Sequence, residues 1–529
     1  MKNVSLPSVM SHSFSRVPEV KVPRSTFNRS CGHKTTFDGG KLIPIFVDEA
    51  LPGDTFKLKM QAFARLATPI VPIMDNLYFE THWFFVPNRL VWDNWEKFNG
   101  QQDNPGDSTD FTVPQLSFPA TTVVAPQDLA NYMGVPALTA GADGFSVNAL
   151  PFRAYNLIFN TWYKDQNAIN NVPVNKGDGP DSLSDYIVQF RGKRHDYFTS
   201  GLPSPQKGPA TPISADLPII TGPTTNGQII RRAADDSAAG VIAGSSFGTA
   251  GGSQLTNGTQ DLYVDPSGNW VADTAIATVN ALRQAVQIHR LYEKDNRGGT
   301  RYTEIIKAHF GVTSPDARLQ RPEYLGGTHS QINFHPVAQT TSTDGTSPQG
   351  NLAAFATTSQ DDHVFTQSFT EHGTVMAIAS VRADLTYQQG LERMWSRQTR
   401  FDYYWPALAH LGEQATLNKE IFLQGVNADD EGVLNYQERY AEYRYKPSRI
   451  SGKFQSGVTG SLDIWHLAEQ FGSLPAFGPS FINDVATNQT VNRVIAVPSE
   501  PQFLLDTYYD LKCTRPMPVY SVPGMMDHF

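Results

Sequence analysis

The sequence predicts a mainly β fold, a sandwich whose strands are joined by long connections. Its 529 residues include 41 Gly, 36 Pro, 31 Phe, 20 Tyr and 8 Trp, a composition that favours turns and pleated surfaces over long helices. Several segments alternate apolar and polar residues with a period of two. Charged residues make up 18% of the chain, below the roughly 25% usual for globular domains, so we expect part of the surface to be hidden in an assembly.

The clearest strand follows the turn Pro52-Gly53-Asp54. From Phe56 to Leu66 apolar residues alternate with polar ones, as in a strand with one buried face. Residues 77–86 carry large apolar groups on both faces and stop at Pro87, which indicates a strand covered on both sides. Further strands are expected over residues 373–385, 491–497 and 503–512.

Helices are expected between these strands. Residues 152–164 follow Pro151, which suits the first turn of a helix, and place large apolar groups at helical spacing. A second helix should run from Asp273, a plausible N-cap, to Gly298-Gly299. A third is expected over residues 302–310, before Gly311.

Composition divides the chain into four parts. Residues 1–50 form a basic arm, since the first 41 residues hold seven Lys or Arg and two acidic residues in a protein of net charge −9. Residues 51–200 are the first part of the β structure, and residues 276–529 are the remainder with a C-terminal arm. Between them, residues 201–275 contain eleven Gly and only three aromatic residues, which indicates either a disordered loop or a surface projection with its own function.

The sequence gives no positive sign of catalysis, and we expect neither catalytic residues nor a cofactor. Two cysteines, Cys31 and Cys513, exclude a disulfide framework and a thiolate metal site, and both are expected to be free. The G-x-S-x-G pattern at 244–248 lacks the strand and helix that a nucleophile elbow requires. Neither an export signal nor a membrane-spanning run is found in the sequence, so membrane insertion is not expected.

One calcium-loop pattern leaves metal binding open. Asn427, Asp429, Glu431 and Glu438 stand at ligand positions of an EF-hand-like loop. The first position should be Asp, and a solitary loop of this kind is more typical of an acidic surface turn. We keep both interpretations.

Long, unusual stretches identify a family. They include ADLTYQQGLERMWSRQTRFDYYWPALAHLGE at 383–413 and RPMPVYSVPGMMDHF at the C-terminus. The others are residues 23–56, 64–76, 85–99, 149–166, 191–209, 311–327 and 436–448. Together they closely resemble the major capsid proteins of gokushoviruses, small icosahedral single-stranded DNA phages of the Microviridae. The resemblance spans nearly the whole chain and is weakest in residues 201–275.

The resemblance implies an eight-stranded antiparallel jelly roll, the viral capsid β-sandwich, with long inter-strand insertions that contain several helices. It further implies a homo-oligomeric T = 1 shell of sixty copies around circular single-stranded DNA, assembled in the cytoplasm of the host bacterium. Implied partners are a small basic DNA-binding protein, an internal scaffolding protein, a minor pilot protein and a host surface receptor.

Two sets of residues are candidates for contacts in such a particle. Cations of the basic arm and of residues 397–405 could face DNA or a neighbouring subunit, namely Lys21, Arg24, Arg29, Lys34, Arg397 and Arg400. The 201–275 segment would form a protrusion at the threefold axis that touches the host, with candidates Ile219, Ile220, Arg231, Arg232, Phe247 and Tyr263.

Two other functions compete with a purely structural role. A carbohydrate-binding or carbohydrate-cleaving sandwich would carry a groove with convergent carboxylates and stacked Trp, because the fold itself does not decide function. A host-adhesion role is compatible with a shell, because the shell can carry its own receptor-binding element.

Overall fold

The computed structural model describes residues 23–208, apart from 121 and 140–142, and residues 320–520, apart from 346. Between these ranges it describes residues 229–232, 238–241, 256–257, 260–264, 279–297 and 308. The chain divides into two units, one made of Met1–Pro205 with Val312–Phe529 and the other of Gln206–Gly311.

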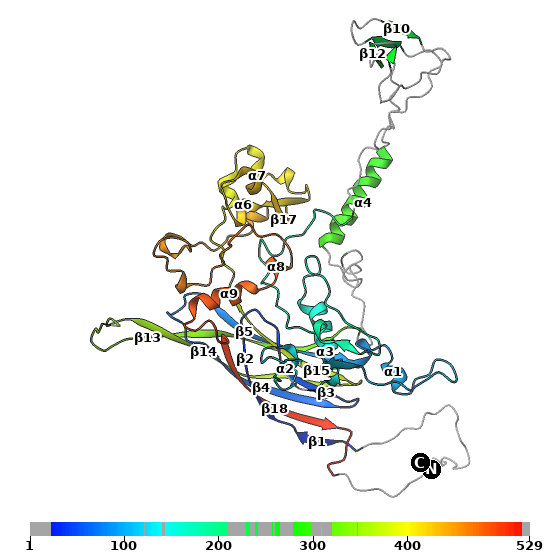
Figure 1. Cartoon of the computed structure of the whole chain (residues 1–529), viewed down its shortest axis with the longest axis vertical. Coiled ribbons are helices and arrows are strands. Elements are labelled where there is room, and N and C mark those ends of the chain that lie inside the picture. The colour runs from blue at the N-terminus through cyan, green and yellow to red at the C-terminus, as the bar shows by residue number, and fades with distance from the viewer. Residues whose placement is uncertain are drawn as a thin grey trace, which may run out of the picture. The chain divides into compact units, whose positions relative to one another are not determined.

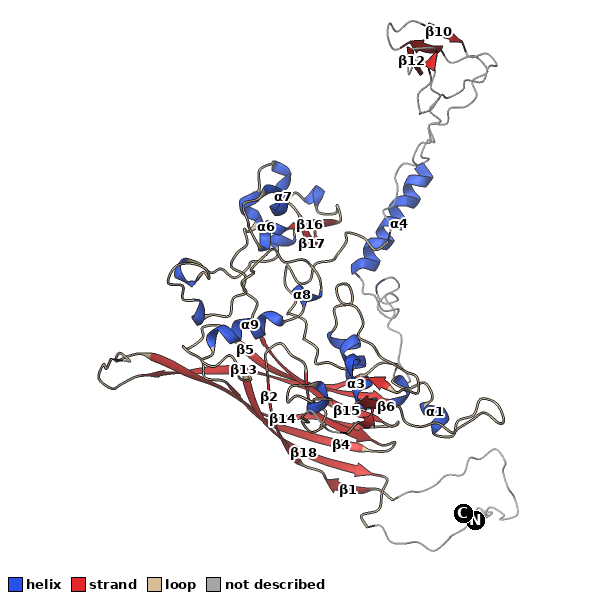
Figure 2. Ribbon diagram, viewed as in Figure 1, coloured by secondary structure: helices blue, strands red, loops and turns tan. Residues whose placement is uncertain are grey.

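A curled antiparallel sheet forms the first unit's framework (Figures 1 and 2). Eight strands follow the order β1-β18-β4-β14-β13-β5-β15-β3, and β2 also pairs with β18. Their bounds are β1 (Ser25–Asn28), β2 (Cys31–Phe37), β3 (Ile43–Ala50), β4 (Thr55–Leu66), β5 (Leu77–Pro87), β13 (Glu323–Ala338), β14 (Leu352–Ser368), β15 (Gly373–Ala383) and β18 (Phe503–Arg515). The long strand β13 joins two halves, because its first part pairs with β5 and its last part with β14.

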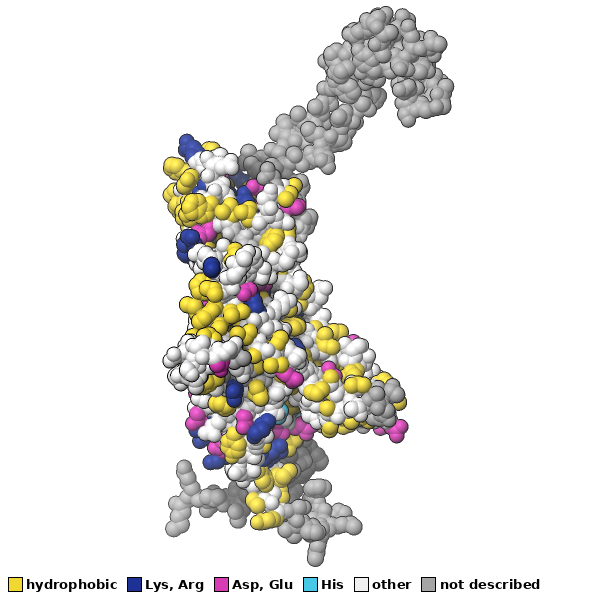
Figure 3. Space-filling model, turned by 60° about the vertical axis from the view of Figure 1, so that its left-hand side comes forward, with side chains coloured by type: hydrophobic (Ala, Val, Ile, Leu, Met, Phe, Trp, Pro, Cys, Tyr) yellow, Lys and Arg dark blue, Asp and Glu magenta, His cyan; other side chains and the backbone are white. Residues whose placement is uncertain are grey.

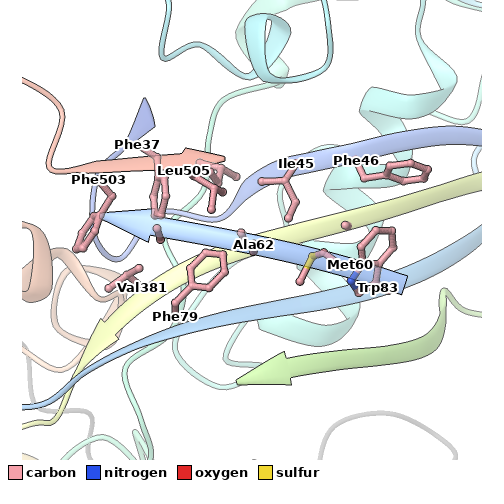
Figure 4. Packing of buried hydrophobic residues seen from close by; sticks show 14 of the residues in the cluster. Phe37, Ile45, Phe46, Met60, Ala62, Phe79, Trp83, Val381, Phe503 and Leu505 are labelled. Atoms are coloured by element: carbon pink, nitrogen blue, oxygen red, sulfur yellow. The ribbon is translucent and has the colours of Figure 1, made fainter. Parts of the chain in front are cut away.

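The two halves of the sheet pack face to face, as the jelly-roll prediction requires. Tyr509 on β18 donates a hydrogen bond of 2.9 Å to the carbonyl of Ile45 on β3. The ring of Trp83 lies 5.2 Å from that of Phe46 and 5.8 Å from that of Tyr509. Figure 4 shows the labelled apolar side chains of these strands directed toward one another. The fold is therefore the mainly β sandwich expected from the sequence.

Helices cover the outer face of one half. Strand β5 points Trp83 into the sandwich and Phe84 into a second core beneath α3 (Leu150–Ile158), as the prediction of two covered faces required. One π-helical turn, Phe159–Tyr163, extends α3, and together they confirm the helix predicted over 152–164. Shorter elements complete this layer: α1 (Trp95–Phe98), β6 (Gln115–Phe118), α2 (Leu129–Tyr132), β7 (Phe145–Asn148) and β8 (Asp181–Ser182).

A second insertion lies between β15 and β18. It contains β16 (Glu413–Leu417), α6 (Asn418–Ile421), α7 (Asn427–Asp430), β17 (Val433–Glu438), α8 (Pro479–Ile482) and α9 (Val485–Val494). Its own small core includes Tyr387, Ile421 and Leu434 and packs on Tyr197 and Phe198. In Figure 1 these elements stand above the sheet, with α9 nearest to it.

The prediction of a strand over residues 491–497 is wrong, because residues 485–494 form helix α9. Asp484 caps the helix by accepting hydrogen bonds from the backbone and hydroxyl of Thr487. Buried positions at Ala486, Thr490, Val491 and Val494 recur at helical spacing. The run of β-branched residues suggested a strand, but this cap and apolar stripe set the local structure.

The basic N-terminal segment contributes strands to the sheet. From residue 25 onward, residues 1–50 supply β1, β2 and β3. Gly40, in the turn between β2 and β3, has φ of +74°, and a Cβ there would lie 1.9 Å from the carbonyl oxygen of Asp484. Both the backbone angle and the close approach therefore require glycine.

The second unit contains a four-stranded sheet in the order β10-β9-β12-β11. Its strands are β9 (Ile229–Arg232), β10 (Ala238–Val241), β11 (Thr256–Asn257) and β12 (Gln260–Val264), and it also holds helix α4 (Val279–Arg297). Helix α4 confirms the second predicted helix, although Asp273 lies outside the described residues, as do 244–248 and nearly all of 302–310. Among the described helices, none is long and apolar enough to cross a membrane.

Candidate functional site

A group of large rings is left exposed in the insertion between β15 and β18. It consists of Trp395, Phe401, Tyr403, Tyr404, Trp405 and Tyr443, which are between 45% and 65% exposed, and we call it the aromatic surface. Five of the six come from three short 3-10 turns and their connections within residues 393–408. On the face drawn in Figure 3, hydrophobic side chains gather over the part of the first unit where this insertion lies.

Two arginines tie the aromatic surface together. Arg397 lies over the rings of Tyr443, at 4.3 Å, and Tyr403, at 5.4 Å, and it pairs with Glu442 at 3.4 Å. Arg400 lies 5.3 Å from the ring of Phe401 and 5.4 Å from that of Trp405. Guanidinium groups stacked on rings restrain exposed aromatics, so these four rings are positioned before anything binds to them.

A cavity of about 580 Å³ opens beside the aromatic surface. Its lining includes Trp395, Arg397 and Tyr443. Five Lys or Arg and three Glu line it, so cations outnumber carboxylates. Each of the three glutamates is paired with a cation: Glu392 with Lys446, Glu420 with Arg393 and Glu442 with Arg397.

The cations predicted near the N-terminus lie on the β1–β2 edge of the sheet. Arg24 donates to the carbonyl of Gly53, and Arg29 forms a two-pronged ion pair with Asp48. Lys34 is 79% exposed and pairs with Asp506 at 3.2 Å; Lys21 lies outside the described residues. No hydrogen bond or ion pair joins these cations to Arg397 or Arg400 within the described chain. The six cations proposed from the sequence therefore belong to two separate groups.

The calcium-loop residues are spread over a helix, a turn and a strand. Asn427 and Asp429 belong to helix α7, and Glu438 ends strand β17. Lys419 pairs with Glu431, and Arg444 with Glu438. No group of three or more His, Cys, Asp or Glu that could hold a metal occurs in the residues that the structure describes. Glu431 and Glu438 are therefore each paired with a cation of the chain itself.

Three of the predicted host-contact residues fall on the second unit's sheet. Arg231 and Arg232 are on β9 and Tyr263 is on β12, where Tyr263 is the register partner of Arg231. Ile219, Ile220 and Phe247 lie outside the described residues.

Both cysteines are free, with Cys31 exposed and Cys513 buried.

A cluster of charges on β5 and β15 was not predicted from the sequence. Glu80 has a nearly buried side chain, and it pairs with Arg191, with Arg194 at 3.4 Å and with Arg382 at 2.9 Å. Burial alone would raise the pKa of Glu80, but the three guanidinium groups outweigh it and lower this pKa to about 2. Burial and the neighbouring Arg191 lower the pKa of Arg382 to about 10.

The cluster could not be found in the sequence because its members are far apart in the chain. Arg191 and Arg194 lie in the segment after α3. Glu80 lies on β5 and Arg382 on the neighbouring strand β15. In the register of these strands, Ser380 is opposite Glu80 and Arg382 is opposite Tyr78. No local motif links these positions. The register of the two strands and the path of the segment after α3 bring them together.

The whole chain is similar to known phage proteins. The family model described as capsid protein (F protein) matches residues 15–525. Capsid protein VP1 of Bdellovibrio phage phiMH2K is 46% identical and VP1 of Chlamydia phage 1 is 42% identical, covering 98% and 99% of both chains respectively. Capsid protein VP1 of Spiroplasma virus 4 is 35% identical over 99% of both chains.

Proposed function

The chain belongs to the capsid protein (F protein) family, and on that premise we propose that sixty copies assemble into a closed T = 1 shell around circular single-stranded DNA. A subunit of a virion shell is a structural protein and not an enzyme. It must hide surface against several neighbours, and obligate contacts typically bury about 2,000 to 5,000 Å² each.

The aromatic surface is the observation that carries the proposal. Aromatic residues and Arg are enriched where proteins bury surface against each other, and Lys, Asp and Glu are depleted. Trp395, Phe401 and Trp405 are half exposed in the single chain, and a neighbouring subunit would remove them from water. Arg397 and Arg400 already stack on four of the six rings, Tyr403, Tyr443, Phe401 and Trp405, so little side-chain entropy of these four would be lost on assembly.

The test is assembly of a variant whose fold should be intact. Trp395→Ser with Phe401→Ser should abolish shells in negative-stain electron microscopy while the far-ultraviolet circular dichroism stays unchanged. Tyr508→Ser is the matched control, because Tyr508 on β18 is 48% exposed and lies outside the aromatic surface. Normal shells from the double variant would reject this surface as a subunit contact.

Genome enclosure would be mainly electrostatic. We assign the candidate contacts to Arg24 and Lys34, because the ion pair of Lys34 with Asp506 is exposed, whereas those of Arg29 with Asp48 and Arg397 with Glu442 are more buried. Arg400 lies within the aromatic surface and is assigned to the neighbouring subunit. Contacts to phosphates are independent of sequence and weaken as salt increases. The chain carries a net charge of −9, so the small basic protein of the phage would supply most of the neutralising charge, while a scaffolding protein and a pilot protein complete assembly.

Host attachment is assigned to residues 201–275. Deletion of residues 207–269 should abolish adsorption to host cells while shells still form. Adsorption at the level of the unaltered particle would reject the receptor role and leave the shell function standing.

A further inference from the structure

A second cavity, of about 530 Å³, lies on the face of β5 and β13 that is turned away from the sandwich core. Its walls come from the end of α3, the segment 191–199 and the two strands. Five Lys or Arg and one acidic residue line it, in a chain whose net charge is −9. A cavity with an excess of cations inside an acidic protein favours an anionic ligand.

The three arginines of the Glu80 cluster have hydrogen-bonding capacity left. An arginine carries five N–H donors, and within the described chain each of the three guanidinium groups has two hydrogen-bond or ion-pair partners. Arg191 contacts Glu80 and Ser380, Arg194 contacts Glu80 and Asp384, and Arg382 contacts Glu80 and the carbonyl of Gly192. One carboxylate therefore fixes three guanidinium groups without satisfying them. Glu80 acts as a positioning residue.

Rings form the neighbouring wall. Trp162 and Tyr324 are 42% and 45% exposed, and their centroids lie 5.9 Å apart. Phe84 supports both from below, at 5.7 and 5.6 Å, and Trp162 donates to the carbonyl of Pro322 at 3.0 Å. Large flat side chains held in this way offer a stacking surface to a ring.

His82 adds no charge at neutral pH. Burial, with help from Arg191, lowers the pKa of His82 to about 4, and its Nδ1 lies 2.9 Å from the hydroxyl of Tyr163. Arg194 is the most accessible of the three arginines, with a side chain 33% exposed against 11% for Arg191 and 14% for Arg382. A ligand entering the cavity would meet Arg194 first.

We propose that this cavity binds a phosphorylated ring compound, with the phosphate on Arg194 and Arg382 and the ring on Trp162 and Tyr324. A guanidinium fork matches two phosphate oxygens, and stacking on aromatic side chains tolerates different rings. Both a nucleotide and a sugar phosphate carry this chemistry. The site does not depend on shell assembly, so it can fail or stand independently of the proposed function.

The test uses the purified full-length protein and isothermal titration. The probes are inorganic phosphate, glucose, thymidine 5′-monophosphate and glucose 1-phosphate. At least one phosphorylated ring should bind about tenfold or more tightly than inorganic phosphate and glucose, because it gains both contacts. If thymidine 5′-monophosphate binds more tightly than glucose 1-phosphate, the ligand is part of the genome. If glucose 1-phosphate binds more tightly, the ligand is a surface glycan.

Variants assign the binding to this cavity. Arg194→Ala should weaken binding about tenfold or more, through loss of charge-assisted hydrogen bonds, and Trp162→Leu should remove the advantage of the ring over inorganic phosphate. The matched controls are Arg65→Ala and Phe63→Leu, which alter an exposed cation and an exposed ring of β4, and both should bind normally. Thermal unfolding checks that Arg194→Ala is folded, and Arg194→Lys, which keeps the charge, should bind with intermediate affinity.

Two results would overturn the proposal. One is the absence of saturable binding by either phosphorylated ring. The other is binding that Arg194→Ala and Trp162→Leu leave unchanged, which would place the ligand elsewhere on the chain.

Discussion

The sandwich interior and the aromatic surface are both rich in large rings, yet only one of them is completed by the single chain. Trp83 is fully buried and has other rings within 6 Å, whereas Trp395 is 65% exposed. Burial of a large apolar side chain contributes about 1.5 to 3 kcal/mol to folding. The interior gains this free energy within the subunit, and we propose that the aromatic surface gains it on assembly. Aromatic content alone does not distinguish a core from an interface.

The largest expected effect comes from emptying the interior. Trp83→Ala should lower the free energy of unfolding by about 3 to 5 kcal/mol, because lost burial and the cavity left behind add together. Chemical denaturation followed by tryptophan fluorescence measures it. Trp83→Phe should cost much less, since the indole N–H of Trp83 is buried without a hydrogen-bond partner. If both variants lose the same free energy of unfolding, the packing of the ring does not account for the stability that Trp83 contributes.

A buried ion pair in the layer beneath α3 should matter almost as much. Arg153 and Asp181 are both fully buried at their side chains and form two hydrogen bonds of 2.7 Å. Arg153→Met removes one partner and leaves the carboxylate buried, which typically costs about 3 to 5 kcal/mol. The denaturation midpoint of this variant is compared with that of the double variant Arg153→Met, Asp181→Leu. The double variant should recover part of the lost free energy of unfolding. If it recovers none, the loss comes from packing and not from the buried charge.

Glu80→Gln should cost about 3 kcal/mol at neutral pH and alter the response to acid. The pKa of Glu80 is lowered from 4.5 to about 2, so its carboxylate stabilises the fold fully above about pH 4.5 and loses this contribution as pH falls toward 2. Unfolding measured between pH 2 and 7 should show a smaller acid-dependent loss in the variant. Parallel curves for variant and unaltered protein would contradict the assignment of this pKa shift to Glu80.

The smallest effect on folding is expected at the aromatic surface. Trp395→Ser should change the free energy of unfolding of the unassembled chain by no more than about 0.5 kcal/mol. Substitutions of exposed residues outside the core, helix caps and ion-pair networks rarely change it by a larger amount. The same denaturation experiment measures it. A loss near that of Trp83→Ala would show that Trp395 belongs to the subunit's own core and would remove the contrast between the two regions.

The sequence predicted those elements whose signal is local. Alternation from Phe56 to Leu66 identified β4, and apolar residues on both faces of 77–86 identified a doubly covered β5. Strands β13 and β14 were not recognised, because β13 contains Gly326-Gly327 and Pro336 and much of β14 is polar. Their pairing with β5 and β4 holds them in place, and such long-range pairing leaves no periodic mark.

The functional residues follow the same division. Arg397 and Arg400 could be noticed because they stand among aromatic residues in one short segment. The Glu80 cluster joins residues from three places in the chain, and only strand register and the segment after α3 make them neighbours. Exposure of the aromatic surface could not be predicted either, because burial depends on which loops cover which face.

Cryo-electron microscopy of particles formed by the full-length chain tests the central claim most directly. The account predicts a closed shell of sixty copies in which Trp395, Phe401 and Trp405 are buried against a neighbouring subunit. A shell in which these rings remain in solvent, or a chain that forms no closed particle under any condition, would contradict it.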